Sequence, residues 1–238
     1  MLNKNDVEIA GNLTRDPETV PYDGGSVTKF TIAINDSAKR DAEPTYVEVV
    51  AFNKTGELCS NLLKKSSAVH VEGPLSIRNY TDKDGNKRKS FEVIVNEFTL
   101  LDLKEKADRA VMQTGFNLNK ITLAGNLVRD PEIKTGKNGP FTIATIAVNG
   151  KRDKKDVMYV DLVSFDKTGA NMALVLAAAS NLRVEGRISI RSYKTAEGAN
   201  RKSLEVIVDD FKAATRKPKA ASESVSADVA PELDEVVL

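Results

Sequence analysis

Two segments of this sequence carry a pair of aromatic residues six positions apart. YVEVVAF holds Tyr46 and Phe52, and YVDLVSF holds Tyr159 and Phe165. Both segments alternate as a β-strand does, so each pair presents two flat rings to the same face of a sheet. Flat rings with nearby cations suit single-stranded nucleic acid, because bases stack on the rings and phosphates attract the cations.

The opposite face of the first segment suits a barrel core, because it consists of Val47, Val49 and Ala51. Glu48 lies on the same face as the aromatic residues of the first segment, and Asp161 does so in the second. A cation at either position would attract phosphate, whereas these carboxylates repel it. Packing in a barrel or at a subunit interface is the alternative role for the aromatic residues. Their recurrence at matching positions favours base stacking.

Few residues could support nucleophilic or metal chemistry. Cys59 is the only cysteine and His70 the only histidine, which excludes intrachain disulfides and a zinc site built from cysteine and histidine. We interpret Cys59 as a buried apolar thiol, and His70, in the strand-like AVHVEG, as a structural or interfacial residue. The sequence has no glycine-rich nucleotide loop and no pair of catalytic histidines. We therefore expect no metal, no cofactor and no catalytic residues.

A duplication of about a hundred residues organises the sequence. AGNLTRDPE at 10–18 returns as AGNLVRDPE at 124–132, and RKSFEVIV at 88–95 returns as RKSLEVIV at 201–208. The offset between the copies is 114 at first and becomes 113 after a one-residue deletion. Each copy is close to the most common size of a protein domain.

Each copy reads as an all-β domain with one short helix. Alternating, β-branched segments predict five strands in the first copy, at about 5–13, 27–35, 45–52, 68–80 and 90–100. TGELCSNLLKKSS predicts a helix, because its leucines recur at helical spacing after Thr55, which can cap it. Its apolar face would hold Leu58, Leu62 and Leu63. Three strands, a helix and two strands are the order of an OB-fold, a five-stranded Greek-key barrel.

The last two strands of each copy frame a long hairpin. YTDKDGNKRKS, at 80–90, would project from the first barrel as an arm. Phe91 and Phe98 alternate with polar residues after it, so we assign them to the core. Phe30 is replaced by Ala144 in the second copy, which indicates that the two barrels pack differently.

Together these motifs resemble the bacterial single-stranded DNA-binding proteins. The resemblance rests on GNLTRDPE, FTIAIN, YVEVVAFNKTGE and VEGPLSIRNYTDKDGNKRKSFEVIV in that order, and it covers about 1–102 and again 119–212. A few members of that family similarly carry two OB domains in one chain. The resemblance implies two tandem OB-folds that bind single-stranded DNA without sequence preference in replication, recombination and repair.

The resemblance also implies roles for individual residues. The base-stacking positions are Tyr46, Phe52, Tyr80, Tyr159, Phe165 and Tyr193. The cations expected to contact phosphate are Arg15, Lys39, Arg40, Lys54, Arg78, Lys87, Arg88, Arg129, Lys151, Arg152, Lys167, Arg191, Arg201 and Lys202. The family usually has tryptophan at several stacking positions and this chain has none, so we expect less stacking area in each domain.

Other roles and other function classes are possible on the sequence alone. The basic loops between strands two and three could be solvated, and Arg15 and Arg129 could equally stabilise a turn with Asp16 or Asp130. A protein-interaction module or oligonucleotide chaperone with a weakened DNA face is a second function class, which the lack of tryptophan favours. An OB-fold nuclease is a third class, for which no carboxylates converge convincingly.

The charge is unevenly spread, although it is +1 overall. Residues 222–238 hold five acidic side chains and no basic one, whereas the rest of the chain holds 35 basic and 29 acidic side chains. We expect 214–238 to be a disordered acidic tail. The end of this tail resembles the terminus with which members of the family dock partner proteins, but it lacks the aromatic ending. The alternative to docking is an end that is only solvated. The docking residues would be Glu232, Asp234, Glu235, Val236, Val237 and Leu238.

The domain plan has consequences for assembly. We expect a first OB domain at 1–102, a linker at 103–118 and a second OB domain at 119–213. Single-domain relatives generally assemble four barrels, so a chain with two barrels would form a homodimer. No segment is apolar for long enough to be a signal peptide or a membrane span, so we expect a cytoplasmic protein.

Overall fold

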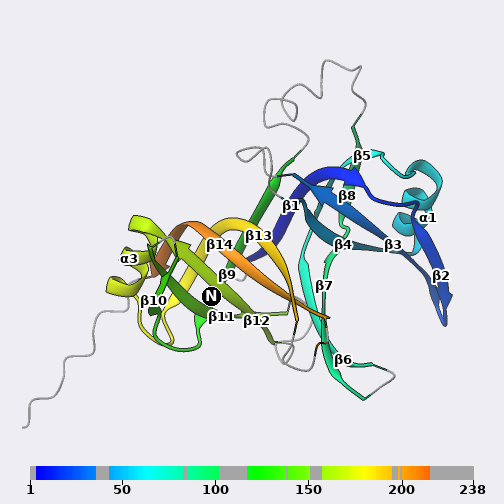
Figure 1. Ribbon diagram of the computed structural model, residues 1–238. Coiled ribbons are helices and arrows are strands. Elements are labelled where there is room, and N and C mark those ends of the chain that lie inside the picture. Colours follow the sequence, from blue (N-terminus) through cyan, green and yellow to red (C-terminus); the bar gives the residue numbers. More distant parts are fainter. Residues whose placement is uncertain are drawn as a thin grey trace, which may run out of the picture.

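Two β-barrels lie side by side in the computed structural model, and one continuous sheet runs through both (Figure 1). The structure describes residues 4–35, 43–82, 85–101, 117–137, 139–150, 157–194, 198 and 200–214. Each barrel is built from strands and carries one short helix. The expected class, two tandem OB-folds, is confirmed.

The first barrel contains eight strands and one helix among the described residues. They are β1 (Lys4–Leu13), β2 (Glu18–Tyr22), β3 (Gly25–Ile34), β4 (Thr45–Phe52), α1 (Asn53–Leu62), β5 (Ala68–Gly73), β6 (Leu75–Thr81), β7 (Lys87–Ile94) and β8 (Glu97–Leu100). Parallel pairing of β4 with β7, at Glu48 with Glu92, closes the barrel.

The second barrel repeats this order with fewer interruptions. Its elements are β9 (Asn119–Leu127), β10 (Glu132–Gly136), β11 (Gly139–Asn149), β12 (Val157–Phe165), α3 (Asp166–Val175), β13 (Asn181–Lys194) and β14 (Asn200–Ala214). Parallel pairing of β12 with β14 closes it, at Asp161 with Glu205. In Figure 1 its helix α3 lies at the end of the molecule farthest from the first barrel.

The prediction of five strands was incomplete in three respects. It placed one strand at 90–100, where the structure has β7 and β8 separated by Val95 and Asn96. It missed β2 and β10, which pair only with the adjacent β3 and β11 and are exposed at every residue, so they have no alternating apolar pattern. It also joined β5 to β6, although Pro74 separates them. Proline has no backbone N–H for the ladder, and where Arg187 replaces it, β13 continues with a bulge at Glu185 and Gly186.

The repeated AGN motif marks a close approach of two strands. A Cβ atom on Gly11 would lie 2.3 Å from the backbone oxygen of Ala33, and one on Gly125 would lie 2.1 Å from that of Ala147. Only glycine fits at such contacts, which allow β1 and β9 to bend into the barrel.

The repeated RDPE motif fixes the loop that follows each helix. Asp16 Oδ1 accepts a hydrogen bond of 2.7 Å from the backbone N–H of Lys65, and Asp130 Oδ1 accepts one of 2.7 Å from that of Ala178. The two aspartates therefore tie the turn after β1 or β9 to the loop between the helix and β5 or β13.

The helix differs from its prediction at both its cap and its buried face. It begins at Asn53, two residues before Thr55, and its N-cap residue makes no side-chain capping hydrogen bond. Leu58 and Leu62 are each 53% exposed, whereas Cys59 and Leu63 are buried. Within the helix the buried residues are the small Gly56 and Cys59, which allow α1 to lie close to β3 and β4, and Leu63 is buried just after the helix ends.

The core consists of branched aliphatic side chains on the inner faces of the strands. Phe30 is 1% exposed in the first barrel, and Ala144 replaces it in the second, so the two cores are filled differently. Phe91 and Phe98, which we assigned to the core, pack against it but are only partly buried. The described residues form no helix long and apolar enough to cross a membrane.

The two barrels join through an antiparallel pairing of β1 with β9. Val7 lies opposite Ile121, its own counterpart in the repeat, so the pairing has the register of a twofold dimer. Asn5 accepts from the N–H of Leu75 and donates to its C=O, and Asn119 does the same with Ile188. Both asparagines thus anchor the base of an arm next to the junction.

Candidate nucleic-acid interface

Five of the six predicted stacking residues are exposed. Tyr46, Tyr80, Tyr159, Phe165 and Tyr193 are between 40% and 57% exposed, and Phe52 is half-buried. Alternation on β4 and β12 directs the neighbouring valines inward, so the aromatic rings project from the outer face of each barrel. These rings are thus accessible to bases at matching positions in the two barrels.

A cleft of about 260 Å³ lies between the first barrel and the arm of the second. The first barrel contributes Tyr46, Tyr80 and Phe91, and the second contributes Arg201 and Lys202. Two predicted stacking residues therefore meet three predicted phosphate contacts at one site, because Arg88 lines the cleft as well. Arg201 and Lys202 are about 120 to 155 positions from the two tyrosines in the sequence. Phe91 was missed as a site residue because its alternation pattern is that of a core position.

An ion pair crosses this cleft. Lys202 Nζ lies 3.1 Å from Glu48 Oε1, and both side chains are about half exposed. The contact explains why an acidic residue stands among the aromatic side chains of β4. The counterpart Asp161 accepts a hydrogen bond of 2.9 Å from Thr145 Oγ1 instead, so the two barrels differ at this position.

A second, larger cleft of about 580 Å³ is also lined by residues of both barrels. Phe52 and Arg78 line it from the first barrel, and Asn149 and Met158 line it from the second. Arg78 is exposed, whereas its counterpart Arg191 lies 3.6 Å from Glu205 through Nε and Oε2.

Phe141 adds an aromatic residue that the sequence analysis did not select. It lies opposite Phe165 in the β11–β12 ladder, and the ring centroids are 6.1 Å apart at an interplanar angle of 40°. Val27 occupies this position in the first barrel, opposite Phe52. The second barrel therefore has an aromatic pair where the first has a single ring, a difference that the repeat alignment could have revealed.

The arm of the first barrel is fixed by its own ion pair. Arg88 Nε donates to Asp82 Oδ2 at 2.7 Å, and the N–H of Asn86 donates to Asp82 Oδ1 at 2.8 Å. The side chain of Arg88 is 26% exposed. Arg88 therefore supports the turn of the arm and also lines the 260 Å³ cleft.

The remaining predicted cations lie at the barrel surface. Arg15, Lys54 and Lys167 are exposed, and Arg129 Nε lies 3.7 Å from Glu132 Oε1. The turn after the first strand is held by Asp16 and Asp130, as described above, and not by an arginine–aspartate pair.

Other predicted site residues lie outside the part of the chain that the structure describes. They are Lys39, Arg40, Lys151, Arg152, the side chain of Lys87, and the tail residues Glu232, Asp234, Glu235, Val236, Val237 and Leu238.

Paired OB barrels with aromatic and basic side chains on their outer faces define a class of nucleic-acid-binding proteins. The model of the Single-strand binding protein family matches residues 4–101 and again 118–214. The chain belongs to that family, with one copy of the family domain in each barrel.

Individual relatives agree with this assignment. Single-stranded DNA-binding protein 1 of Xylella fastidiosa is 34% identical over 113 residues, which cover 44% of this chain and 82% of that protein. Single-stranded DNA-binding protein 2 of Chlorobaculum tepidum is 40% identical over 109 residues, covering 43% of this chain and 74% of that protein. Each of these relatives therefore aligns with less than half of this chain, about the extent of one barrel.

A solved structure matches both barrels. The crystal structure of the wild-type single-stranded DNA binding protein from Thermus aquaticus has a TM-score of 0.71 at 21% identity, over 94% of this chain and 100% of that chain. The likeness shows that the two chains share their fold over nearly their whole length.

Proposed function

We propose that this protein binds single-stranded DNA without sequence preference, and that both barrels take part. The observation that carries the proposal is the cleft at which Tyr46 and Tyr80 meet Arg201 and Lys202. Rings stack on any base and cations attract every phosphate, so such a site has little means of reading sequence. Covering of single strands during replication, recombination and repair follows from this chemistry and is typical of the family.

The stacking residues in the proposal are those that the repeat matches. The rings are Tyr46, Phe52, Tyr80, Tyr159, Phe165 and Tyr193, to which we add Phe141. The phosphate contacts that belong to described side chains are Arg15, Lys54, Arg78, Arg88, Arg129, Lys167, Arg191, Arg201 and Lys202. We propose the same role for Lys39, Arg40, Lys87, Lys151 and Arg152.

Binding is proposed to be the whole activity, without catalysis. The family model and the relatives named above are of DNA-binding proteins. The named relatives are bacterial, and DNA in bacteria lies in the cytoplasm, so we propose that compartment for this chain.

The domain plan and the assembly are proposals as well. We propose OB domains at 1–102 and 119–213, a linker at 103–118, and a tail at 214–238 whose acidic end docks replication or repair proteins. The β1–β9 pairing already joins two barrels as a twofold dimer would, so a homodimer would bring together four. Sedimentation equilibrium should give twice 25.9 kDa, and a mass of one chain at micromolar concentration would contradict the dimer.

Titration with oligo-dT of several lengths at two salt concentrations tests the function. We expect saturable binding that weakens with salt, because binding releases counterions from the phosphates and this release becomes less favourable as the salt concentration rises. We also expect the affinity to rise with oligonucleotide length until both barrels are covered. A protein-interaction module with an inactive DNA face would bind none of these oligonucleotides, and loss of the oligonucleotide during incubation with a divalent metal would indicate a nuclease.

A further inference from the structure

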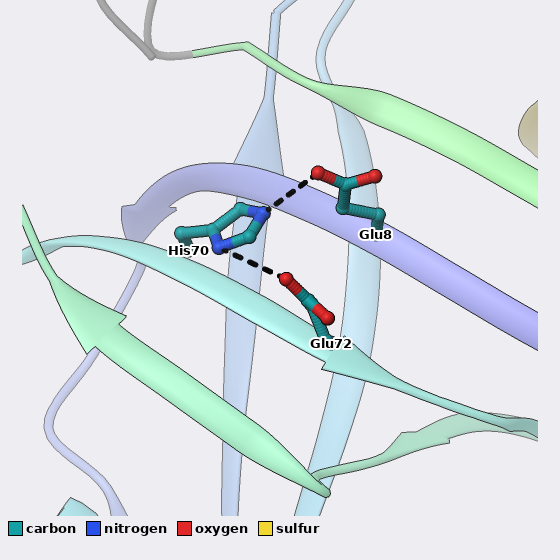
Figure 2. Close-up of side chains that lie close together, drawn as sticks. All are labelled: Glu8, His70 and Glu72. Atoms are coloured by element: carbon teal, nitrogen blue, oxygen red, sulfur yellow. Dashed lines mark hydrogen bonds and ion pairs between the residues drawn. The ribbon is translucent and has the colours of Figure 1, made fainter. Parts of the chain in front are cut away.

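His70 lies between two carboxylates on the outer face of the first barrel, on strands that line neither cleft at this point. Its Nε2 is 3.3 Å from Glu8 Oε1, and its Nδ1 is 3.9 Å from Glu72 Oε1 (Figure 2). Glu8 belongs to β1, and the other two residues belong to β5. The His70 side chain is 14% exposed, whereas those of Glu8 and Glu72 are 41% and 54% exposed.

The strand register brings three carboxylates into one line. Glu8 lies opposite Glu72 in the β1–β5 ladder, and Glu72 lies opposite Glu97 in the β5–β8 ladder. We call Glu8, Glu72 and Glu97 the carboxylate row. Like charges directly opposite each other destabilise a sheet, so this arrangement needs positive charge close by.

The second barrel shows how the same positions are neutralised. Thr122, Glu185 and Asp210 form the corresponding row, and Arg183 and Lys212 lie opposite each other beside it. Arg183 Nη2 donates to Glu185 Oε1 at 2.8 Å.

The first barrel lacks these cations at the equivalent positions. His70 stands in place of Arg183 and Thr99 in place of Lys212, and Glu8 adds a carboxylate where the second barrel has Thr122. Lys120 of β9 lies opposite Glu8, but no ion pair joins them in the described part of the chain. The carboxylate row therefore lacks the two flanking cations of its counterpart and has Glu8 where the counterpart has Thr122, although Lys120 lies opposite Glu8 and Asp6 lies opposite Thr122.

We propose that Glu8, His70 and Glu72 bind a divalent transition-metal ion of the zinc class. One imidazole nitrogen and two carboxylate oxygens are a ligand set that zinc accepts, with water completing the coordination. Ligand atoms of the three residues lie within 4.8 Å of one another.

The separations fit a metal site after a small side-chain movement. Metal–ligand bonds of roughly 2.0–2.2 Å place neighbouring tetrahedral ligands about 3.3–3.5 Å apart, and the distance between His70 Nε2 and Glu8 Oε1 is 3.3 Å. The metal lies between these two atoms. The exposed carboxylate of Glu72 rotates from the Nδ1 side of the ring to supply the third ligand, and the register of the ladder keeps it within reach.

Zinc titration of the full chain by isothermal calorimetry tests the site against matched variants. His70→Arg and Glu8→Thr each copy the second barrel, so both substitutions have a template in this fold. We expect one tight zinc ion per wild-type chain and none in His70→Arg. We expect Glu8→Thr to bind zinc at least about tenfold more weakly. Loss of a residue that only orients a metal ligand already lowers metal affinity about tenfold, and Glu8 is a ligand itself. The unfolding midpoint should rise with zinc only where zinc binds.

Transfer of the site to the second barrel is the complementary test. The double variant Thr122→Glu with Arg183→His recreates the three ligands there, and we expect it to bind two zinc ions per chain. Equal zinc uptake by the wild type and His70→Arg, or no uptake by the wild type, would overturn the proposal. Oligo-dT affinity should be the same in His70→Arg as in the wild type, which separates this site from the DNA-binding function.

Discussion

Glu48 is an acidic side chain at a surface that we propose binds an anionic polymer. Its partner Lys202 comes from the arm of the other barrel, so phosphate and Glu48 compete for the same ammonium group. We expect Glu48→Gln to tighten oligo-dT binding by up to about 1 kcal/mol at low salt and little at high salt, since exposed ion pairs are weak and screened.

Asp161→Asn provides the matched control for this prediction. Asp161 accepts from Thr145 and pairs with no cation among the described residues, so its substitution should change the affinity less. A Glu48→Gln variant that binds no more tightly than Asp161→Asn at low salt would show that the ion pair does not restrain Lys202.

Cys59 illustrates a residue whose chemistry could be inferred from the sequence. Burial raises the pKa of its thiol to about 11, and the side chain is fully buried. The thiolate, which is the reactive form, is therefore scarce until the pH approaches that value. We expect almost no reaction with a thiol reagent near pH 8 in the native protein and complete reaction in denaturant. Rapid labelling of the native chain would contradict this.

At the scale of elements, the strands were predictable from the sequence where one face of the strand is buried and the other is exposed to solvent. Tyr46, Val47 and Val49 alternate in the structure as they do in the sequence. The edge strand β2 has no buried face and therefore no pattern. The pairing of Lys202 with Glu48 depends on how two barrels meet, and local periodicity contains no information about that.

The bend of the first strand gives a prediction for each barrel. Gly11→Ala should lower the free energy of unfolding by about 1–3 kcal/mol, as overpacking usually does, because its Cβ would lie 2.3 Å from the oxygen of Ala33. Gly125→Ala should cost a similar amount for the same reason. Urea unfolding measures both, and an unchanged midpoint in either variant would refute the close approach in that barrel.

At the scale of the whole molecule, the duplicated barrels form one unit through β1 and β9. Because Val7 lies opposite Ile121, its counterpart in the repeat, the two barrels pair with each other as the two subunits of a twofold dimer would. The repeat predicted two similar domains but not this pairing, because strand partners distant in sequence leave no local signal. Small differences between the copies, such as Pro74 in the first barrel and Arg187 at the equivalent position of the second, make the surfaces of the two barrels differ.

The acidic end of the chain opposes the basic body. Five acids in 222–238 are tethered to a body with six more basic than acidic side chains. Removal of Ser222–Leu238 should therefore tighten oligo-dT binding at low salt, have little effect at high salt, and abolish recovery of any replication protein that the full chain captures. Unchanged low-salt affinity together with intact partner recovery would leave the tail without the proposed role.

The central claim is that bases stack on the repeated tyrosines while the cations hold phosphate. Oligo-dT affinity measured against salt for the wild type, the Tyr80→Ala with Tyr193→Ala double variant, and Lys202→Gln tests it most directly. The account predicts that the double variant loses roughly 1–3 kcal/mol per stacked base with an unchanged salt slope. It predicts that the salt slope of Lys202→Gln falls by about 1. Wild-type affinity in the tyrosine variant, or a loss expressed only through its salt slope, would contradict the account.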